Sequence, residues 1–255
     1  MEESLYPLMR QLEDEHWWFV ARREIIAALL TRLPLPAGAD ILEVGCGTGG
    51  NIPILKRFGT VTCVEQDESA AELARQRQGA TVLPGSLPHN LPEFRSLFDL
   101  ITLLDVIEHV DEDCASLVAL ARLLKPGGRM VITVPAFNFL WSRHDDENQH
   151  KRRYRRSDLK VLARRANLSL NYVSYFNTWL FLPVAAVRLL RKIFPYQEPW
   201  QDMRMPRPFI NQVLKKILSS ERHMIGKIAL PFGISLATVL SLPNRQTPAI
   251  GRHAP

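Results

Sequence analysis

The chain has 255 residues, of which 46 % are hydrophobic, and a formal net charge of +6. That is enough apolar material for the core of one large α/β domain with an elaborated end. The three cysteines are scattered and form no CxxC pair, which argues against a disulfide framework or a structural zinc site and fits a reducing compartment. Residues 1–10 are mixed and acidic without an apolar core, so no signal peptide is expected.

In chain order, apolar runs alternate with helical patterns, which predicts a doubly wound α/β fold with a parallel sheet. A first helix is expected at residues 15–32, ending before Pro34, because proline interrupts helices. Strands are expected at residues 41–44, 61–64, 81–83, 100–104, 130–134 and 170–175. Helices are expected at residues 51–58, 70–78, 115–124 and 157–166, the last with Ser157 as N-cap and Asp158 in its first turn.

The most informative stretch is residues 41–51, Ile-Leu-Glu-Val-Gly-Cys-Gly-Thr-Gly-Gly-Asn. An apolar strand runs directly into a glycine cluster, which lets the backbone approach a ligand closely. Glu65 stands 20 residues after Gly45, at the end of the next apolar run, where a carboxylate can accept hydrogen bonds from both ribose hydroxyls. These features predict a nucleoside-cofactor site at the mouth of a βαβ unit.

The charge next to the glycines discriminates between cofactors. Gly45, Gly47 and Gly50 fit the dinucleotide pattern G-x-G-x-x-G, which leaves a nicotinamide-dependent oxidoreductase as an alternative. Glu43 would repel a pyrophosphate but suits a cationic ligand such as S-adenosylmethionine. The chain also lacks a Tyr-x-x-x-Lys pair, which counts further against the oxidoreductase.

Further motifs follow at ordered spacing: Phe-Asp-Leu at 98–100, Asp-Val-Ile-Glu-His-Val at 105–110 and Leu-Lys-Pro-Gly-Gly at 124–128. With the glycine turn and Glu65, they resemble the class I S-adenosylmethionine-dependent methyltransferases over roughly residues 39–177. This resemblance implies a Rossmann-like, seven-stranded sheet, mostly parallel with an antiparallel last strand at 234–242, and a helical insertion between strands six and seven. It divides the chain into an N-terminal helical cap (1–38), the cofactor-binding core (39–177), the insertion (178–232), and the last strand with a mobile tail (233–255).

The resemblance also implies a set of cofactor-binding residues. The turn's backbone faces the cofactor, Glu65 holds the ribose, and residues after strands two and three lie beside the adenine. The N-terminal helix contributes an aromatic ring and an arginine at the aminoacyl end. The expected residues are Glu43, Gly45, Cys46, Gly47, Gly49, Glu65, Gln66, Ser86, Leu87, Asp105, Trp18 and Arg22.

Candidate catalytic residues cluster after strand four. If a helical turn forms there, Asp105 shares a face with Glu108 and His109. We expect His109 to be a general base, with Glu108 and His150 also in the catalytic group. Resemblance to metal-using ubiquinone-pathway and small-RNA O-methyltransferases implies an optional Mg²⁺ site of Asp105, Glu108, His109 and His150; the alternative is that Glu108 and His109 order the loop.

The acceptor is less well defined. A Trp-Trp-Phe start with Arg22 and Arg23, the element His-x-Arg-Arg-Tyr at 150–154 and the end at 230–236 resemble a bacterial methyltransferase group linked to glycans and lipids. We therefore predict O-methylation of a small-molecule, glycan or lipid-linked acceptor by a cytoplasmic protein. Alternatives are Mg²⁺-assisted methylation of a diol and a non-catalytic membrane adaptor.

Basic residues are concentrated at 143–156, where they suit a phosphate group, and again at 188–216. The second cluster accompanies apolar stretches too short or too interrupted to span a bilayer. Segment 178–232 is therefore expected to cap the substrate pocket or to contact the inner face of a membrane, or both. Nucleic acid is an unlikely partner, because no aromatic stacking platform interleaves with the basic residues.

Overall fold

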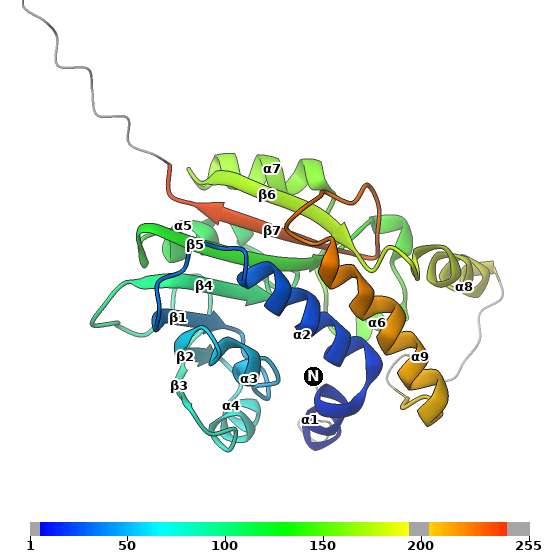
Figure 1. Cartoon of the computed structure of the whole chain (residues 1–255). Coiled ribbons are helices and arrows are strands. Elements are labelled where there is room, and N and C mark those ends of the chain that lie inside the picture. The colour runs from blue at the N-terminus through cyan, green and yellow to red at the C-terminus, as the bar shows by residue number, and fades with distance from the viewer. Residues whose placement is uncertain (1–5, 194–203, 244–255) are drawn as a thin grey trace, which may run out of the picture.

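The computed structural model describes residues 6–193 and 204–243 and contains one seven-stranded sheet with helices on both faces (Figure 1). The strand order is β3-β2-β1-β4-β5-β7-β6. The strands are β1 (Ala39–Val44), β2 (Gly59–Glu65), β3 (Ala80–Pro84), β4 (Phe98–Leu104), β5 (Leu124–Pro135), β6 (Ser169–Phe176) and β7 (Ser235–Ser241). Strand β7 is antiparallel to both β5 and β6, whereas β1 to β5 pair in parallel. The predicted Rossmann-like sheet and its antiparallel last strand are confirmed.

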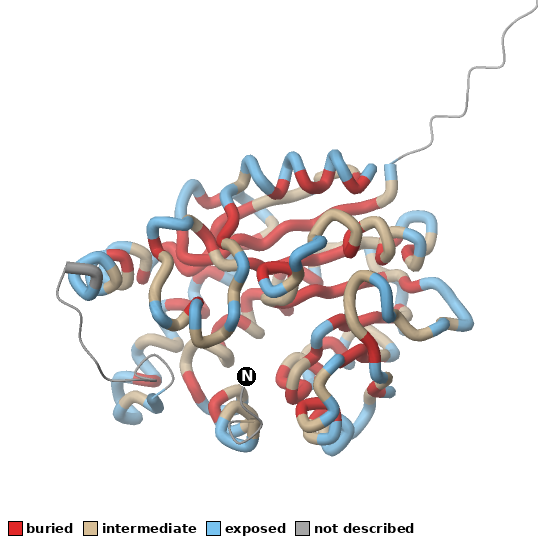
Figure 2. Tube along the Cα trace, turned by 180° about the vertical axis from the view of Figure 1, so that it is seen from behind, coloured by how far each residue is buried: buried red, intermediate tan, exposed pale blue. Residues whose placement is uncertain are grey.

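Period-two side-chain alternation divides the core between the two faces of the sheet. Ile41 and Leu100 point to one face, while their neighbours Leu42 and Ile101 point to the other. Because both faces are covered, these strands are apolar almost throughout. Figure 2 shows the buried strands in the interior and the exposed outer sides of the helices.

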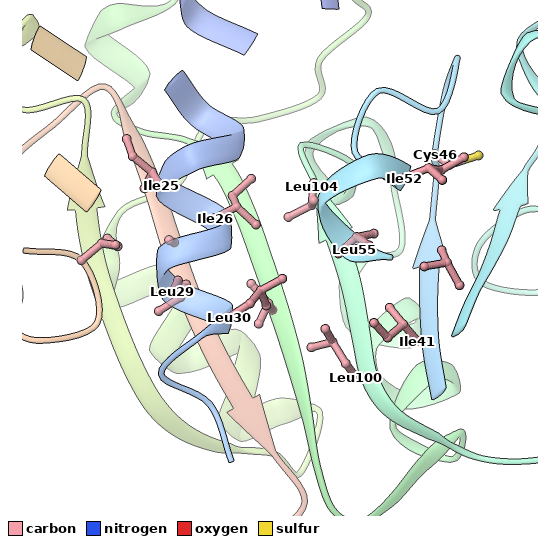
Figure 3. Close-up of a cluster of buried hydrophobic side chains, with 14 of the residues drawn as sticks. Ile25, Ile26, Leu29, Leu30, Ile41, Cys46, Ile52, Leu55, Leu100 and Leu104 are labelled. Carbon is pink, nitrogen blue, oxygen red and sulfur yellow. The ribbon is translucent and has the colours of Figure 1, made fainter. Parts of the chain in front are cut away.

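The helices cover the two faces unequally. The first face carries α2 (Trp17–Leu30), α3 (Ile52–Leu55), α4 (Glu68–Arg75) and α9 (Pro208–Ser219), and the second carries α5 (Asp113–Ala121) and α7 (Arg156–Arg165). Figure 3 shows Ile25, Ile26, Leu29 and Leu30 of α2 directed towards the strands. The other helices are α1 (Tyr6–Glu15), α6 (Arg143–Glu147) and α8 (Phe181–Ile193).

The structure corrects three local predictions. The helix expected at 15–32 is confirmed as α2, but it begins at Trp17, where the His16 side chain caps it by accepting a hydrogen bond from Trp18 N at 3.3 Å, and a separate helix, α1, that was not predicted precedes it. The predicted helix 51–58 is only the single turn α3. Ser157 is not an N-cap: α7 begins at Arg156, and Arg155 N donates to the Asp158 carboxylate at 2.8 Å.

Between β6 and β7 the chain forms α8 and α9, which confirms the helical insertion. Pro183 does not interrupt the first of these helices, because it lies in the opening turn, where no backbone donor is needed. Among the described residues, no helix combines the length and apolarity that a membrane span requires. The predicted mobile tail lies largely outside the described residues.

The insertion is joined to the core by buried polar contacts. Asn211 of α9 donates from Nδ2 to Glu15 O at 2.9 Å and accepts from Trp17 N at 2.8 Å. Glu221 accepts hydrogen bonds from the N–H groups of Asn177 and Thr178 at 2.7 and 2.6 Å, just where the chain leaves β6. The insertion therefore packs as part of the main body.

Candidate functional site

The glycine turn follows β1 at the carboxyl edge of the sheet. Gly45, Gly47 and Gly49 have φ values of 70°, 54° and 81°, a region that side chains disfavour. A Cβ on Gly45 would lie 2.8 Å from Val106 Cγ2, whereas the position facing Gly47 has no atom within 4 Å. The turn is thus tightly packed behind and open in front, as a ligand cradle requires.

Glu65, at the end of β2, lies beside this turn. Its Oε2 accepts a hydrogen bond from Gly47 N at 2.7 Å, and its Oε1 accepts one from Gln66 N at 2.9 Å. These two donors fix the carboxylate next to the open position. The structure therefore brings together the two parts of the predicted nucleoside site.

Glu43 is almost completely buried behind the turn, with 1 % of its surface exposed. Burial raises the pKa of its carboxyl group from 4.5 to about 7, against the opposing effect of a hydrogen bond from Asn51 Nδ2 at 2.9 Å. A nearby cation would stabilise the ionised form. This fits a sulfonium and ammonium ligand better than a pyrophosphate.

The N-terminal helices reach the same edge. Arg22 of α2 is buried and forms an ion pair with Asp105, Nη2 to Oδ2, at 2.7 Å. The same nitrogen donates to Thr133 Oγ1 at 3.1 Å, and the guanidinium lies 5.3 Å from the ring centroid of Trp18. Arg22 Nε is buried without a hydrogen-bond partner.

A contact of α1 with the turn was missed by the sequence analysis. Thr48 Oγ1 donates to Glu13 Oε2 at 2.5 Å, and Arg77, in the loop after α4, pairs with the same oxygen at 3.1 Å. Arg77 Nε also donates to Thr48 O at 2.8 Å. Leu8 and Leu12, at i,i+4 spacing, were the available signal for this helix. The N-terminal cap is thus hydrogen-bonded directly to the glycine turn.

The predicted adenine-side residues lie on neighbouring loops. Gln66 is exposed directly after Glu65, and Leu87 is half-buried. Ser86 exchanges backbone hydrogen bonds with Asn90 at 2.8 and 3.0 Å, which closes the loop after β3. Cys46 is buried within the turn itself.

The structure gathers three of the four candidate metal ligands. Donor atoms of Glu108, His109 and His150 all lie within 4.8 Å of one another. Asp105 is not in this group, because its carboxylate is taken by Arg22 and Thr133. A short 3₁₀ turn, Ile107–His109, provides the local helix that was expected after β4.

Glu108 is unusual because it is fully buried and both carboxylate oxygens lack a hydrogen-bond partner. Burial, and next the nearby Asp105, raise its pKa well above the usual range. The His109 and His150 rings meet edge to face, with centroids 4.7 Å apart. Desolvation, and then the neighbouring His150, lower the pKa of His109 to about 4.

A second, buried carboxylate orients His150. Asp145 accepts a hydrogen bond from His150 Nδ1 at 2.8 Å and from Arg153 Nε at 2.8 Å. Although burial acts to raise the pKa of Asp145, the His150 and Arg153 contacts hold it well below its usual range. With Nδ1 engaged, Nε2 of His150 is left to accept a proton or to bind a metal.

Ion pairs within the fold engage part of the basic run at 143–156. Arg153 is buried on Asp145, and Arg152 pairs with Asp113 at 2.9 Å. Arg143 likewise pairs with Glu147 at 2.7 Å. Much of this charge is therefore neutralised within the fold.

An open glycine turn facing a strand-end carboxylate, in a doubly wound sheet, defines a Rossmann-like nucleoside-cofactor protein. Residues 18–173 match the family model described as a methyltransferase domain. The chain belongs to this family and is a class I S-adenosylmethionine-dependent methyltransferase. The predicted cofactor and enzyme class are confirmed, and the oxidoreductase alternative is set aside.

Known proteins are similar to different extents. A ubiquinone biosynthesis O-methyltransferase from Xanthomonas axonopodis pv. citri is 33 % identical over 118 residues, 44 % of this chain and 48 % of that protein. The chain thus aligns with about half the length of the curated relatives it matches.

Two solved structures share the fold. A putative methyltransferase from Haloferax volcanii, solved with the Trm112 activator, has a TM-score of 0.60 and 19 % identity, covering 92 % of both chains. Phosphoethanolamine N-methyltransferase 2 from Haemonchus contortus, solved with S-adenosyl-L-methionine, has a TM-score of 0.56 and 18 % identity. It covers 85 % of this chain and 51 % of that one.

Proposed function

We propose that the protein methylates an oxygen atom of a small-molecule, glycan or lipid-linked acceptor at the carboxyl edge beside β4. The observation that carries this proposal is the grouping of Glu108, His109 and His150 next to the cofactor-facing turn. Curated relatives named as O-methyltransferases support oxygen as the accepting atom.

For methyl transfer to a hydroxyl group, the protein must mainly align the two reactants and remove the hydroxyl proton. S-adenosylmethionine, when bound, supplies a methyl group that is already activated on a sulfonium. The chain's residues must orient the acceptor, exclude water and accept the hydroxyl proton. Two imidazoles can accept this proton: His109, which is exposed at this edge, and His150, whose Nδ1 is held by Asp145. The other imidazole then hydrogen-bonds the acceptor oxygen.

Among the three acceptor classes, a lipid-linked compound is favoured. The insertion beside the site exposes apolar side chains, including Trp179 and Leu182, as a hydrophobic acceptor requires. A lipid-linked acceptor would lie in a membrane. We therefore also propose that the protein binds peripherally at the inner face of a membrane, where it would reach this acceptor.

Cofactor binding is the first test. Calorimetric titration with S-adenosylhomocysteine should give micromolar affinity, and Glu65→Gln should weaken it by roughly 10- to 100-fold, the value of a charge-assisted hydrogen bond. Glu72→Gln, an exposed glutamate on α4, should bind like wild type. Absence of binding to the wild-type chain would contradict the proposal, and binding without turnover on any lipid-linked, glycan or small-molecule acceptor would favour the adaptor alternative.

A metal-assisted reaction on a diol is the second candidate, and the orphaned Glu108 oxygens favour it. They fit a cation, since a buried carboxylate without a partner is costly. Glu108, His109 and His150 would hold the ion, which would lower the pKa of an acceptor hydroxyl. One carboxylate with two imidazoles suits Mn²⁺ or Zn²⁺ better than Mg²⁺, which prefers oxygen ligands.

Calorimetry with Mn²⁺, Zn²⁺ and Mg²⁺ tests this candidate without an acceptor. Glu108→Gln should weaken Mn²⁺ or Zn²⁺ binding by more than about 100-fold, because loss of an outer-shell partner alone costs up to that factor. His89→Gln changes an exposed histidine that pairs with Glu112 and is not one of the three grouped residues, so it should bind as wild type does. Equal affinities of wild type and Glu108→Gln would exclude the site, as would the absence of binding to wild type.

A further inference from the structure

Helix α9 carries an apolar stripe that the rest of the chain does not cover. Phe209 is 79 % exposed, and Ile210, Val213 and Ile217 follow it at helical spacing with their side chains exposed as well. The opposite side of this helix is fixed to the core by Asn211 and by the buried Leu218. Because these contacts fix the orientation of α9, its apolar stripe faces away from the core.

Helix α8 has a second apolar face. Leu182 is 71 % exposed, and Leu189 and Leu190 are exposed about two turns later. In Figures 1 and 2 both helices lie at the same end of the molecule. Because α8 starts five residues after β6 ends, this is the carboxyl end of the parallel strands, where the cofactor site lies.

An aromatic cluster lies between this face and the sheet. Phe181 of α8 contacts Phe232 and Phe137, with ring centroids 5.4 and 5.9 Å apart, and Phe137 stacks on Tyr175 at 4.9 Å. Phe139 and Phe232 of this cluster are also exposed. The aromatic contacts thus run from Tyr175 of β6 to Phe181 at the start of α8 and on to the exposed Phe232.

The charges around these stripes are predominantly positive. In residues 178–193 and 204–232 the one acidic residue is Glu221, which is buried, while Glu24 of α2 pairs with Lys215 and Arg222. Arg207 and Lys216 are exposed beside the stripe of α9. An apolar face with mainly cationic borders complements an anionic lipid surface, and it opposes a two-fold contact with a second copy, which would bring cations together.

We propose that α8 and α9 form a docking surface for a bilayer containing anionic phospholipids. The apolar stripes enter the boundary between head groups and acyl chains, and the flanking cations contact phosphates. Docking presents the aromatic cluster to the membrane, so an acceptor embedded in the bilayer has a short apolar path to the site. Bilayer binding does not depend on methyl transfer, and it concerns a segment beyond residues 18–173 of the family match.

Vesicle co-sedimentation tests the surface. Wild type should bind phosphatidylcholine vesicles that contain phosphatidylglycerol more tightly than pure phosphatidylcholine vesicles, and added salt should weaken this binding. The double variant Leu182→Glu, Phe209→Glu should lower the partition coefficient by about tenfold or more, because each loses burial of a large apolar side chain. Arg207→Gln with Lys216→Gln should lower it by roughly tenfold and reduce the salt dependence.

Val161→Glu is the matched control, since Val161 is 53 % exposed on α7, away from the docking surface, and its variant should bind vesicles normally. All variants should bind S-adenosylhomocysteine as wild type does, which separates this test from that of the proposed function. Three results would overturn the proposal: no binding of wild type to anionic vesicles, unchanged binding of the Leu182→Glu, Phe209→Glu variant, or a wild-type dimer in sedimentation velocity that this variant dissociates.

Discussion

At the residue scale, Glu43 shows how a ligand site can oppose stability. The folded chain raises the pKa of this buried carboxyl group from 4.5 to about 7, so folding favours its neutral form. Its contribution to stability is therefore fully present below about pH 4.5 and is lost as pH rises through about 7. The loss is about 3 kcal/mol, a cost that a cationic ligand offsets when it stabilises the carboxylate.

We predict that Glu43→Gln removes this pH dependence. Glutamine keeps an oxygen to accept the Asn51 hydrogen bond but cannot ionise. Urea unfolding across the range from about pH 4.5 to 8 should show wild type losing about 3 kcal/mol that the variant retains. S-adenosylmethionine should bind wild type more tightly as pH rises through about 7, and the variant weakly throughout. Glu93→Gln, an exposed glutamate, should follow wild type, and parallel curves for wild type and Glu43→Gln would refute the assignment.

Residues in one local unit could be placed from the sequence, whereas long-range pairs could not. The glycine turn and Glu65 lie on adjacent strands of one βαβ unit, so their meeting at Gly47 N follows from chain order. The pairing of Arg22 with Asp105 depends on how α2 crosses the sheet, and no local pattern encodes that crossing. This pairing removed Asp105 from the expected metal ligands.

At the scale of elements, the strands were predictable because most are buried on both faces and read as apolar runs. The ends of the strands were less predictable. Strand β5 begins at Leu124, which pairs with Phe98, although residues 115–124 were expected to form a helix. The helix α1 was missed because only one of its residues, Leu12, is buried, which leaves only a weak apolar stripe to read in the sequence. Its contact with the turn, through Glu13, depends on tertiary structure alone.

Charge patterning was the least reliable guide at this scale. The run at 151–156 resembles a basic patch in sequence, but folding brings Asp145 and Asp113 from other segments to Arg153 and Arg152. At α9, Arg207 and Lys216 are exposed, whereas Lys215 pairs with Glu24 of α2 at 3.9 Å. A basic cluster therefore predicts a binding surface only where the neighbouring elements lack carboxylates.

At the scale of the whole molecule, the division of the chain into cap, core, insertion and last strand raises the question of whether these parts unfold separately. Asn211 of the insertion is hydrogen-bonded to Glu15 and Trp17 at the junction of α1 and α2, and Glu221 holds the end of β6. These contacts are buried, so breaking them leaves unpaired backbone groups at about 1–3 kcal/mol each. We therefore expect the cap, insertion and core to unfold together.

Asn211→Ala tests this expectation. The variant leaves Trp17 N and Glu15 O without their partner, so it should destabilise the protein by about 2–4 kcal/mol while keeping one unfolding transition. Hydrogen exchange should show α2, α9 and the central strands losing protection in parallel. Gln212→Ala changes the next, exposed residue of the same helix and should leave stability nearly unchanged. If α9 exchanged early in Asn211→Ala while β4 and β5 kept their protection, the insertion would be a separable unit, and docking on a membrane could then reposition it without disturbing the cofactor site.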